Sequence, residues 1–163
     1  MILRSDTSPR TELLFVCHGN ICRSVAAEMV MRQLIDLSDL NSRFSAASAA
    51  VSAEELGNDI YPPMKQALRR AGIPFERHYA RQINRTDYEH FDHIIAMDNS
   101  NMRRLRSVFG GDPQQKLSLL LTWAGRPGRE IDDPWYTCDF DGSLRQIQIG
   151  CRGLLDELLR QRG

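Results

Sequence analysis

The sequence contains few cysteines and no excess of charge of either sign. Four cysteines in 163 residues are too few for a secreted scaffold held by disulfides. Because 21 acidic residues match 21 basic ones, the formal net charge is zero, and we expect neither a nucleic-acid partner nor a membrane partner. The chain also lacks a run of about 20 apolar residues and an apolar N-terminal segment of signal-peptide length. These absences predict a cytoplasmic location.

The chain shows no pattern of metal ligands. Cys17 and Cys22 lack the two-residue spacing typical of zinc sites, and the histidines at positions 18, 78, 90 and 93 form no recognisable ligand pair with them. A chain of this length can bury roughly 70% of the surface that its unfolded form exposes, so its core needs neither metals nor disulfides. We therefore expect no metal and no other cofactor.

Apolar runs alternate with helical patterns along the chain, without an internal repeat or a low-complexity linker. Strands are predicted at residues 13–16, 44–51, 93–97 and 116–121, and helices at residues 24–37, 62–70, 98–108 and about 141–160, with a further helix start at 86–89. Strands that alternate with helices indicate βαβ units. The sequence predicts a single α/β domain over residues 1–163, with an open, mostly parallel four-stranded sheet, helices on both faces, and a frayed segment at residues 1–11.

Residues 17–24 lie between the first predicted strand and the first helix, where open α/β sheets bind ligands. Gly19 permits a tight backbone path, and a loop that enters a helix aims several N–H groups at an anion. The Arg23 guanidinium can bind two phosphoryl oxygens, and the same positive field favours a thiolate at Cys17. The pattern predicts a phosphate-binding loop with Cys17 as nucleophile. In the alternative interpretation, Cys17 is a small buried residue and Arg23 a solvated helix residue.

Residues 15–24, with the sequence FVCHGNICRS, resemble the signature of the low-molecular-weight protein tyrosine phosphatases. Residues 80–83 (ARQI), 91–101 (FDHIIAMDNSN) and 133–136 (DPWY) also resemble segments of that family, in the same order. The resemblance covers about residues 12–160, which is nearly the whole chain. It implies a phosphatase that acts on phosphotyrosine in proteins and on small aryl phosphates.

The resemblance implies a mechanism with three catalytic residues. Cys17 attacks phosphorus and forms a phosphocysteine, while Arg23 and the loop amides hold the phosphoryl oxygens. Asp133 protonates the departing phenolate and then acts as base for the water that cleaves the phosphocysteine. By itself Asp133 is equally well explained as a turn residue before Pro134.

The resemblance also assigns residues that surround the catalytic ones. The substrate-binding set is His18, Gly19, Asn20, Ile21, Cys22, Ser24, Glu54, Trp135 and Tyr136, and the loop-supporting set is Ser48 and Asp98. Trp135 and Tyr136 form an aromatic wall for the substrate ring, and Glu54 on the opposite rim should repel acidic residues that flank a phosphotyrosine. A serine at a helix start such as Ser24 is commonly its cap.

The four cysteines receive different assignments. Cys22 matches a second loop cysteine that forms a reversible disulfide with the nucleophile and guards it from over-oxidation, the alternative being a passive thiol that faces the sheet. Cys138 and Cys151 match no functional position. The expected partner is a phosphotyrosine-containing protein, and the expected state is a monomer that can form a weak dimer.

The same residues argue against four other functions. An arsenate reductase of this fold needs further cysteines in mid-chain, and none lies between Cys22 and Cys138. A protein-arginine phosphatase carries threonine where this chain has Ile21, whose bulk suits a phenyl ring. A phosphoryl-carrier protein would lack the pair of Arg23 and Asp133, and a catalytically silent phosphopeptide-binding module usually loses the cysteine or the acid.

Overall fold

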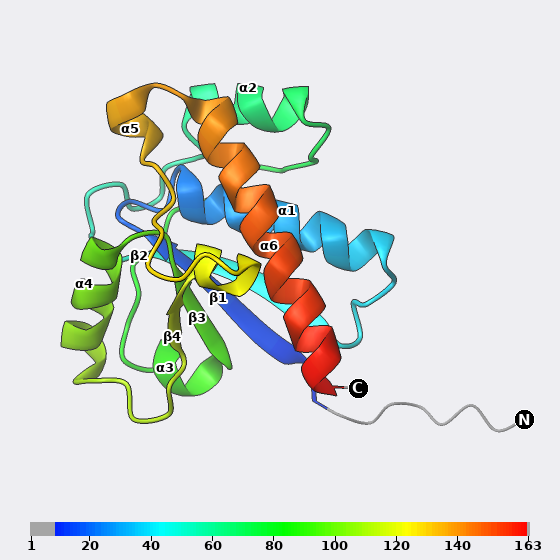
Figure 1. Cartoon of the computed structure of the whole chain (residues 1–163). Helices are drawn as coiled ribbons and strands as arrows, with labels where there is room; N and C mark the ends of the chain where they lie inside the picture. Colours follow the sequence, from blue (N-terminus) through cyan, green and yellow to red (C-terminus); the bar gives the residue numbers. More distant parts are fainter. Residues whose placement is uncertain (1–8, 163) are drawn as a thin grey trace, which may run out of the picture.

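The computed structural model describes residues 9–162 (Figure 1). The elements follow in the order β1 (Thr11–Cys17), α1 (Arg23–Leu37), β2 (Phe44–Ala50), α2 (Pro62–Arg70), α3 (Asp87–His90), β3 (His93–Ala96), α4 (Asn99–Phe109), β4 (Leu117–Leu119), η1 (Leu120–Ala124), α5 (Pro134–Thr137) and α6 (Phe140–Arg162). Residues 1–8 of the predicted frayed segment (residues 1–11) lie outside the described residues. The last residue of that segment, Thr11, is the first residue of β1. Within the described range, no helix combines the length and apolar character needed to cross a bilayer.

The four strands form one sheet in the order β2-β1-β3-β4, and every pairing is parallel. This confirms the predicted single α/β domain with an open four-stranded sheet. Strands β2 and β3 lie on opposite sides of β1, so the strand order reverses at β1. Ligands of open α/β sheets bind in the crevice outside the carboxyl ends of strands at such a switch point. The loop that follows Cys17 therefore lies at the expected position for a site.

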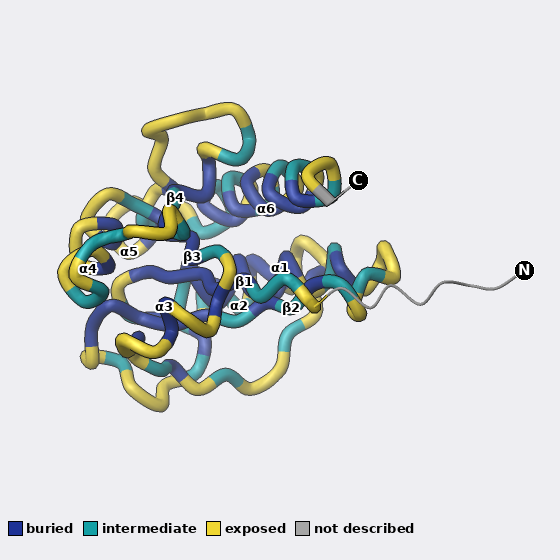
Figure 2. The backbone as a smooth tube through the Cα atoms, turned by 90° about the horizontal axis from the view of Figure 1, so that it is seen from below, coloured by how far each residue is buried: buried dark blue, intermediate teal, exposed yellow. Residues whose placement is uncertain are grey.

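Strand β1 is buried on both faces by two hydrophobic clusters. Leu13 and Phe15 contact the cluster that includes α1, α2 and α6, whereas Leu14 and Val16 contact the cluster that includes α3 and α4. Figure 1 shows α1 and α6 crossing on one side of the sheet, with α3 and α4 on the other side. Figure 2 shows α6 alternating between buried and exposed residues along its length, as expected for a helix with one face on the core. Helices therefore cover both faces, as predicted.

The predicted strand at residues 116–121 is shorter than expected, because the chain turns into the 3₁₀ helix η1 at Leu120. Helix α6 packs on η1 at two glycines. A Cβ atom on Gly150 would lie 2.5 Å from Leu120 Cγ, and one on Gly153 would lie 2.6 Å from the carbonyl oxygen of Trp123. The two glycines allow this close packing, and Leu120 is consequently fully buried under α6 instead of extending the sheet.

The region before the last helix contains a further short helix, α5, that the sequence pattern did not predict. Asp133 accepts a hydrogen bond from the Trp135 N–H at 3.0 Å and so caps α5, whose first residue is Pro134. Proline fits the first position of a helix because its missing N–H has no partner there. Helix α6 begins at Phe140, slightly earlier than the predicted start near residue 141.

Candidate active site

A pocket of about 390 Å³ opens at the carboxyl end of the sheet. Its lining consists of Cys17, His18, Gly19, Ile21, Cys22, Arg23, Glu54, Glu55, Asp133, Trp135 and Tyr136. Three distant segments supply these residues: the loop between β1 and α1, the segment after β2, and the start of α5. The tertiary structure thus brings most of the predicted site residues into one pocket, and it adds Glu55, which the sequence analysis did not predict.

Cys17 is the last residue of β1 and lies at the bottom of the pocket with 3% exposure. Its Sγ atom is 3.0 Å from the hydroxyl oxygen of Ser24, in the first turn of α1. The side-chain amide of Asn20 donates to Ser24 Oγ and to Ser48 Oγ, both at 2.9 Å. Because Asn20 supplies a hydrogen to Ser24 Oγ, the hydroxyl hydrogen of Ser24 is free to point at Cys17.

The chain of hydrogen bonds ends at Glu28, which sequence analysis did not predict. Ser48 donates its hydroxyl hydrogen to Glu28 Oε1 at 2.5 Å, and the buried Glu28 carboxylate also pairs with Arg32 one helical turn later. A carboxylate only accepts, so Ser48 must donate to it and accept from Asn20. Glu28 therefore orients this series of hydrogen bonds toward Cys17. The one sequence signal for this role is the Glu28–Arg32 spacing on α1.

The structure places Asn20 and Ser24 behind the loop, although the sequence analysis grouped both with the substrate-binding residues. Both are 0% exposed and neither lines the pocket, since their side chains bond to each other and to neighbouring elements. Asn20 has a φ of 61°, a left-handed conformation that asparagine tolerates better than most residues. Its Oδ1 accepts from the Arg81 N–H at 3.2 Å, and its carbonyl oxygen is 2.7 Å from His78 Nε2. The segment around His78 and Arg81 thus supports the loop from behind.

Asp59 anchors this supporting segment. Its carboxylate accepts from the N–H groups of Ile60 and His78, from Lys65 Nζ, and from the Arg77 guanidinium. Desolvation opposes the charged form, but these hydrogen bonds outweigh it and hold the pKa of Asp59 well below its ordinary value. The ionised form of Asp59 is therefore the form that stabilises the fold.

We expect Asp59→Asn to destabilise the protein by about 1–2 kcal/mol at pH 7, because four charge-assisted hydrogen bonds are weakened. The stabilisation is complete above the unfolded pKa of about 3.9 and is lost as the pH falls toward the lower folded pKa. Urea unfolding should therefore show a smaller difference from the wild type at pH 3 than at pH 7. The exposed Asp156 on α6 provides a control, Asp156→Asn, with little expected effect. An equal loss at both pH values would contradict this role.

Arg23 is 3% exposed and is held by groups from two other segments of the chain. Its Nη1 donates to the Ile131 carbonyl at 3.0 Å, and its Nη2 donates to Asp98 at 2.9 Å and to Asp133 at 3.3 Å. Burial lowers the pKa of Arg23, but Cys17, Asp133 and Asp98 together raise it above its ordinary value. The guanidinium is therefore charged, oriented, and close to the cysteine.

Asp98 contacts the site while it also starts a helix. One carboxylate oxygen accepts from Arg23, and the other accepts from the Asn101 N–H at 2.8 Å in a capping box at the start of α4. Because the helix fixes its position, Asp98 provides a rigid anchor for Arg23. The family resemblance assigned Asp98 to loop support, and in the structure Asp98 contacts the loop residue Arg23.

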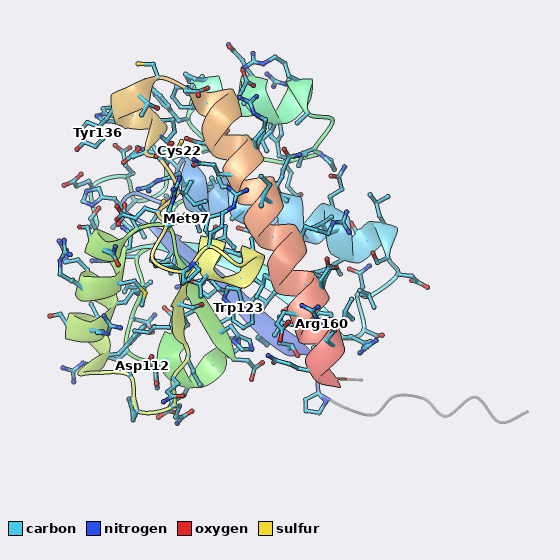
Figure 3. All side chains as sticks on the ribbon, in the orientation of Figure 1. Cys22, Met97, Asp112, Trp123, Tyr136 and Arg160 are labelled. Atoms are coloured by element: carbon cyan, nitrogen blue, oxygen red, sulfur yellow. The ribbon has the colours of Figure 1, made fainter. Side chains whose placement is uncertain are left out.

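Two aromatic residues extend the pocket toward solvent. Trp135 and Tyr136 are 62% and 83% exposed, and Figure 3 shows Tyr136 at the outer edge of α5. The Trp135 ring packs on Tyr61, with 5.4 Å between the ring centroids. Tyr61 has no distinguishing sequence pattern, so its role as support for this wall was not predicted.

The opposite side of the pocket contains a histidine and a glutamate within hydrogen-bonding distance of each other. His18 Nε2 is 3.0 Å from Glu54 Oε2, and both groups are well exposed. The two segments are also joined through the backbone, since the N–H and the hydroxyl of Ser52 both donate to the His18 carbonyl. Glu54 therefore has a defined position relative to the loop.

All four cysteines are free thiols. Burial, followed by the proximity of Cys17, strongly raises the pKa of Cys22, so Cys22 is a neutral thiol beside the predicted nucleophile. Cys138 is exposed at the end of α5. Cys151 is buried against α1, where its Sγ lies 3.7 Å from the Ala27 carbonyl, and burial raises its pKa as well.

Comparison with known proteins gives a consistent result. The sequence profile of the family described as "Low molecular weight phosphotyrosine protein phosphatase" matches residues 12–163. The low molecular weight protein-tyrosine-phosphatase YfkJ of Bacillus subtilis is 36% identical over 92% of this chain and 97% of its own. The human low molecular weight phosphotyrosine protein phosphatase is also 36% identical, over 89% of this chain and 94% of its own.

Solved structures agree with the sequence relatives. The crystal structure of YfkJ superposes with a TM-score of 0.92 at 34% identity, covering 96% of this chain and 99% of that one. The Drosophila arginine phosphatase DARP superposes with a TM-score of 0.78 at 29% identity, covering 90% and 96%. The family match and these relatives identify this protein as a phosphoric monoester hydrolase. The chain belongs to the low molecular weight phosphotyrosine protein phosphatase family.

Proposed function

We propose that this enzyme hydrolyses phosphotyrosine in proteins, and small aryl phosphates, through a phosphocysteine on Cys17. The observation that carries the proposal is that Asp133 meets Cys17 and Arg23 in one pocket although 110 residues separate it from Arg23. A nucleophile, a bidentate cation and a carboxyl group around one anion-sized space are the groups that phosphoryl transfer requires.

In the first step, the Cys17 thiolate attacks phosphorus and the bond from phosphorus to the phenolic oxygen breaks. Arg23 and the N–H groups of the loop hold the other three oxygens, on which negative charge accumulates. The Arg23–Asp133 contact, at 3.3 Å, is longer than the 2.9 Å contact to Asp98. An incoming phosphoryl group displaces Asp133 from the guanidinium, the released carboxylate takes up a proton from solvent, and it then donates this proton to the departing phenolate.

In the second step, water attacks the phosphocysteine and Asp133 takes a proton from that water. The bond between sulfur and phosphorus breaks, inorganic phosphate leaves, and the thiolate of Cys17 is regenerated. The Ser24 hydroxyl, 3.0 Å from Sγ, stabilises the thiolate as it departs. Ser24 receives a hydrogen from Asn20, so its own hydrogen faces the sulfur throughout the cycle.

The walls of the pocket favour a planar ring as the substrate group. Ile21 from the loop and the aromatic pair of Trp135 and Tyr136 line the entrance. A phosphotyrosine ring fits between such walls, whereas the charged guanidinium of phosphoarginine would be desolvated against Ile21. Because the fold is similar to that of DARP, phosphoarginine is the second candidate substrate. Its hydrolysis can be compared directly with that of the aryl phosphates.

The test is to measure hydrolysis of p-nitrophenyl phosphate, a phosphotyrosyl peptide and phosphoarginine in the presence of EDTA. We expect the two aryl phosphates to be hydrolysed without added metal, and phosphoarginine to be hydrolysed at least tenfold more slowly in kcat/KM, which is about 1.4 kcal/mol. No hydrolysis of either aryl phosphate would overturn the proposal. A preference for phosphoarginine would replace it with the second candidate.

We also propose that Cys22 protects the nucleophile from over-oxidation. Its neutral thiol lies at the start of α1 beside Cys17, where it can react with a sulfenic acid on Cys17 to form a disulfide and release water. After a peroxide pulse, dithiothreitol should restore the activity of the wild type but much less of the activity of Cys22→Ser. Equal recovery in both proteins would contradict this role, and Cys138→Ser is the matched control.

A further inference from the structure

The entrance of the pocket carries more negative than positive charge. Arg23 and His18 are the basic side chains in the described lining, and Arg23 lies at the bottom, where the phosphoryl group would take up its charge. Nearer the entrance, Glu54 and Glu55 both line the pocket. A peptide that carries a phosphotyrosine must therefore pass carboxylates beyond the phosphate site.

Glu54 is held at this entrance by contacts that do not depend on substrate. Its carboxylate lies 3.0 Å from the His18 ring, and Ser52 ties the same segment to the His18 carbonyl with two hydrogen bonds. His18 directly follows Cys17, so the distance between Glu54 and the reacting atoms is set by the loop itself. At 68% side-chain exposure, Glu54 remains accessible to a bound peptide.

Among the described residues that line the opposite side of the entrance, none is a compensating cation. Trp135 and Tyr136 form that side, and the ring of Trp135 is packed on Tyr61. With the phosphotyrosine ring against the aromatic wall, the neighbouring peptide residues emerge between this wall and Glu54. The charge of those neighbouring residues then acts directly on Glu54.

We propose that Glu54 is a specificity-determining residue that selects phosphotyrosyl peptides with lysine or arginine beside the phosphotyrosine and disfavours those with acidic neighbours. This inference rests on the proposed function and names the substrate class of the same site. An exposed charge pair changes affinity about two- to fivefold, and the attraction of lysine and the repulsion of glutamate act in opposite directions. We therefore expect kcat/KM to be on the order of tenfold higher for a lysine-flanked peptide than for its glutamate-flanked counterpart.

The test uses three phosphotyrosyl peptides that differ only in having lysine, alanine or glutamate on both sides of the phosphotyrosine. In Glu54→Gln the lysine-to-glutamate ratio should fall to roughly threefold, and in Glu54→Lys it should fall to about one or below. Glu89→Gln, which changes an exposed glutamate outside the pocket, should keep the wild-type ratio. Raising the NaCl concentration from 50 mM to 500 mM should reduce the wild-type ratio, because exposed charges are screened.

Hydrolysis of p-nitrophenyl phosphate, which has no flanking residues, separates the two proposals. A wild-type ratio near one, or a ratio that Glu54→Gln leaves unchanged, overturns the role of Glu54 when p-nitrophenyl phosphate is hydrolysed normally. If the wild type does not hydrolyse p-nitrophenyl phosphate or any of the peptides, the proposed function itself fails and the role of Glu54 falls with it.

Discussion

Replacing Cys17 by serine is expected to abolish turnover, with a loss in kcat of roughly 10⁶-fold, as for the removal of a nucleophile in other covalent enzymes. A serine hydroxyl in the same place is not ionised by the positive field that stabilises a thiolate, so the covalent intermediate cannot form. The substrate-binding groups remain, because Arg23 is held by Asp98 and Ile131 independently of the sulfur. Stopped assays with a phosphotyrosyl peptide measure the loss.

Two further measurements make the Cys17 result specific. Cys17→Ser should still bind the phosphotyrosyl peptide in calorimetry and should unfold near the wild-type temperature, because the substitution is small and buried. Cys138→Ser, which changes an exposed cysteine outside the pocket, should retain full activity. In the wild type, acid quenching during turnover should trap phosphate on Cys17. Turnover by Cys17→Ser at a rate near that of the wild type would rule out the covalent mechanism.

The second large effect is expected at Asp133. Asp133→Asn removes the proton donor, and we expect kcat/KM for phenyl phosphate, which reports the first step, to fall by about 10²–10⁴-fold. The fall should be much smaller for p-nitrophenyl phosphate, because nitrophenolate is a stable leaving group that needs little protonation. Asparagine retains the size of Asp133 and can still cap α5 by accepting from the Trp135 N–H. The difference between the two substrates therefore reports proton donation and not a change in structure.

The neighbouring carboxylate offers a matched control for Asp133. Asp132 is exposed, does not line the pocket, and accepts a hydrogen bond from Gln146 at 3.0 Å on α6. Asp132→Asn should therefore leave both substrates within about twofold of the wild type. If Asp133→Asn lowered kcat/KM equally for both substrates, or if Asp132→Asn had the larger effect, Asp133 would not be the acid.

In the proposed mechanism, the contact between Asp133 and Arg23 links substrate binding to catalysis. In the free enzyme Arg23 interacts with both Asp98 and Asp133, and the Asp98 contact is part of a capped helix. Asp98 therefore stays while Asp133, on a short helix near the surface, can exchange Arg23 for the substrate. In the proposed mechanism, a phosphoryl group that takes the place of Asp133 on Arg23 also brings the acid to the leaving group.

Much of the site was predictable because its chemistry is concentrated in one short segment. Cys17, Gly19 and Arg23 lie within seven consecutive residues that must form a turn between a buried strand and a helix. Chain connectivity alone keeps such residues close together. Asp133 could be assigned only through its resemblance to a family segment, because 110 residues separate it from Arg23.

Other residues could not be predicted because their roles arise only from packing. Glu28, His78 and Tyr61 are ordinary helix or loop residues in the sequence, and their partners Ser48, Asn20 and Trp135 lie on other elements. The same reason explains the placement of Asn20. The sequence shows that it belongs to the loop, but its left-handed backbone and the neighbours behind the loop turn its side chain away from the pocket.

The amino-acid sequence by itself determined the α/β class, the order of the main elements, and the loop in which Cys17 and Arg23 are held. These features depend on local periodicity and on residues close together in the chain. The tertiary structure alone decided which side chains face the pocket, how Glu28 orients the hydrogen bonds toward Cys17, and how His18 holds Glu54 at the entrance. Those contacts join strands and loops that are distant in the chain, and they exist only once the parallel sheet brings the carboxyl ends of its strands together.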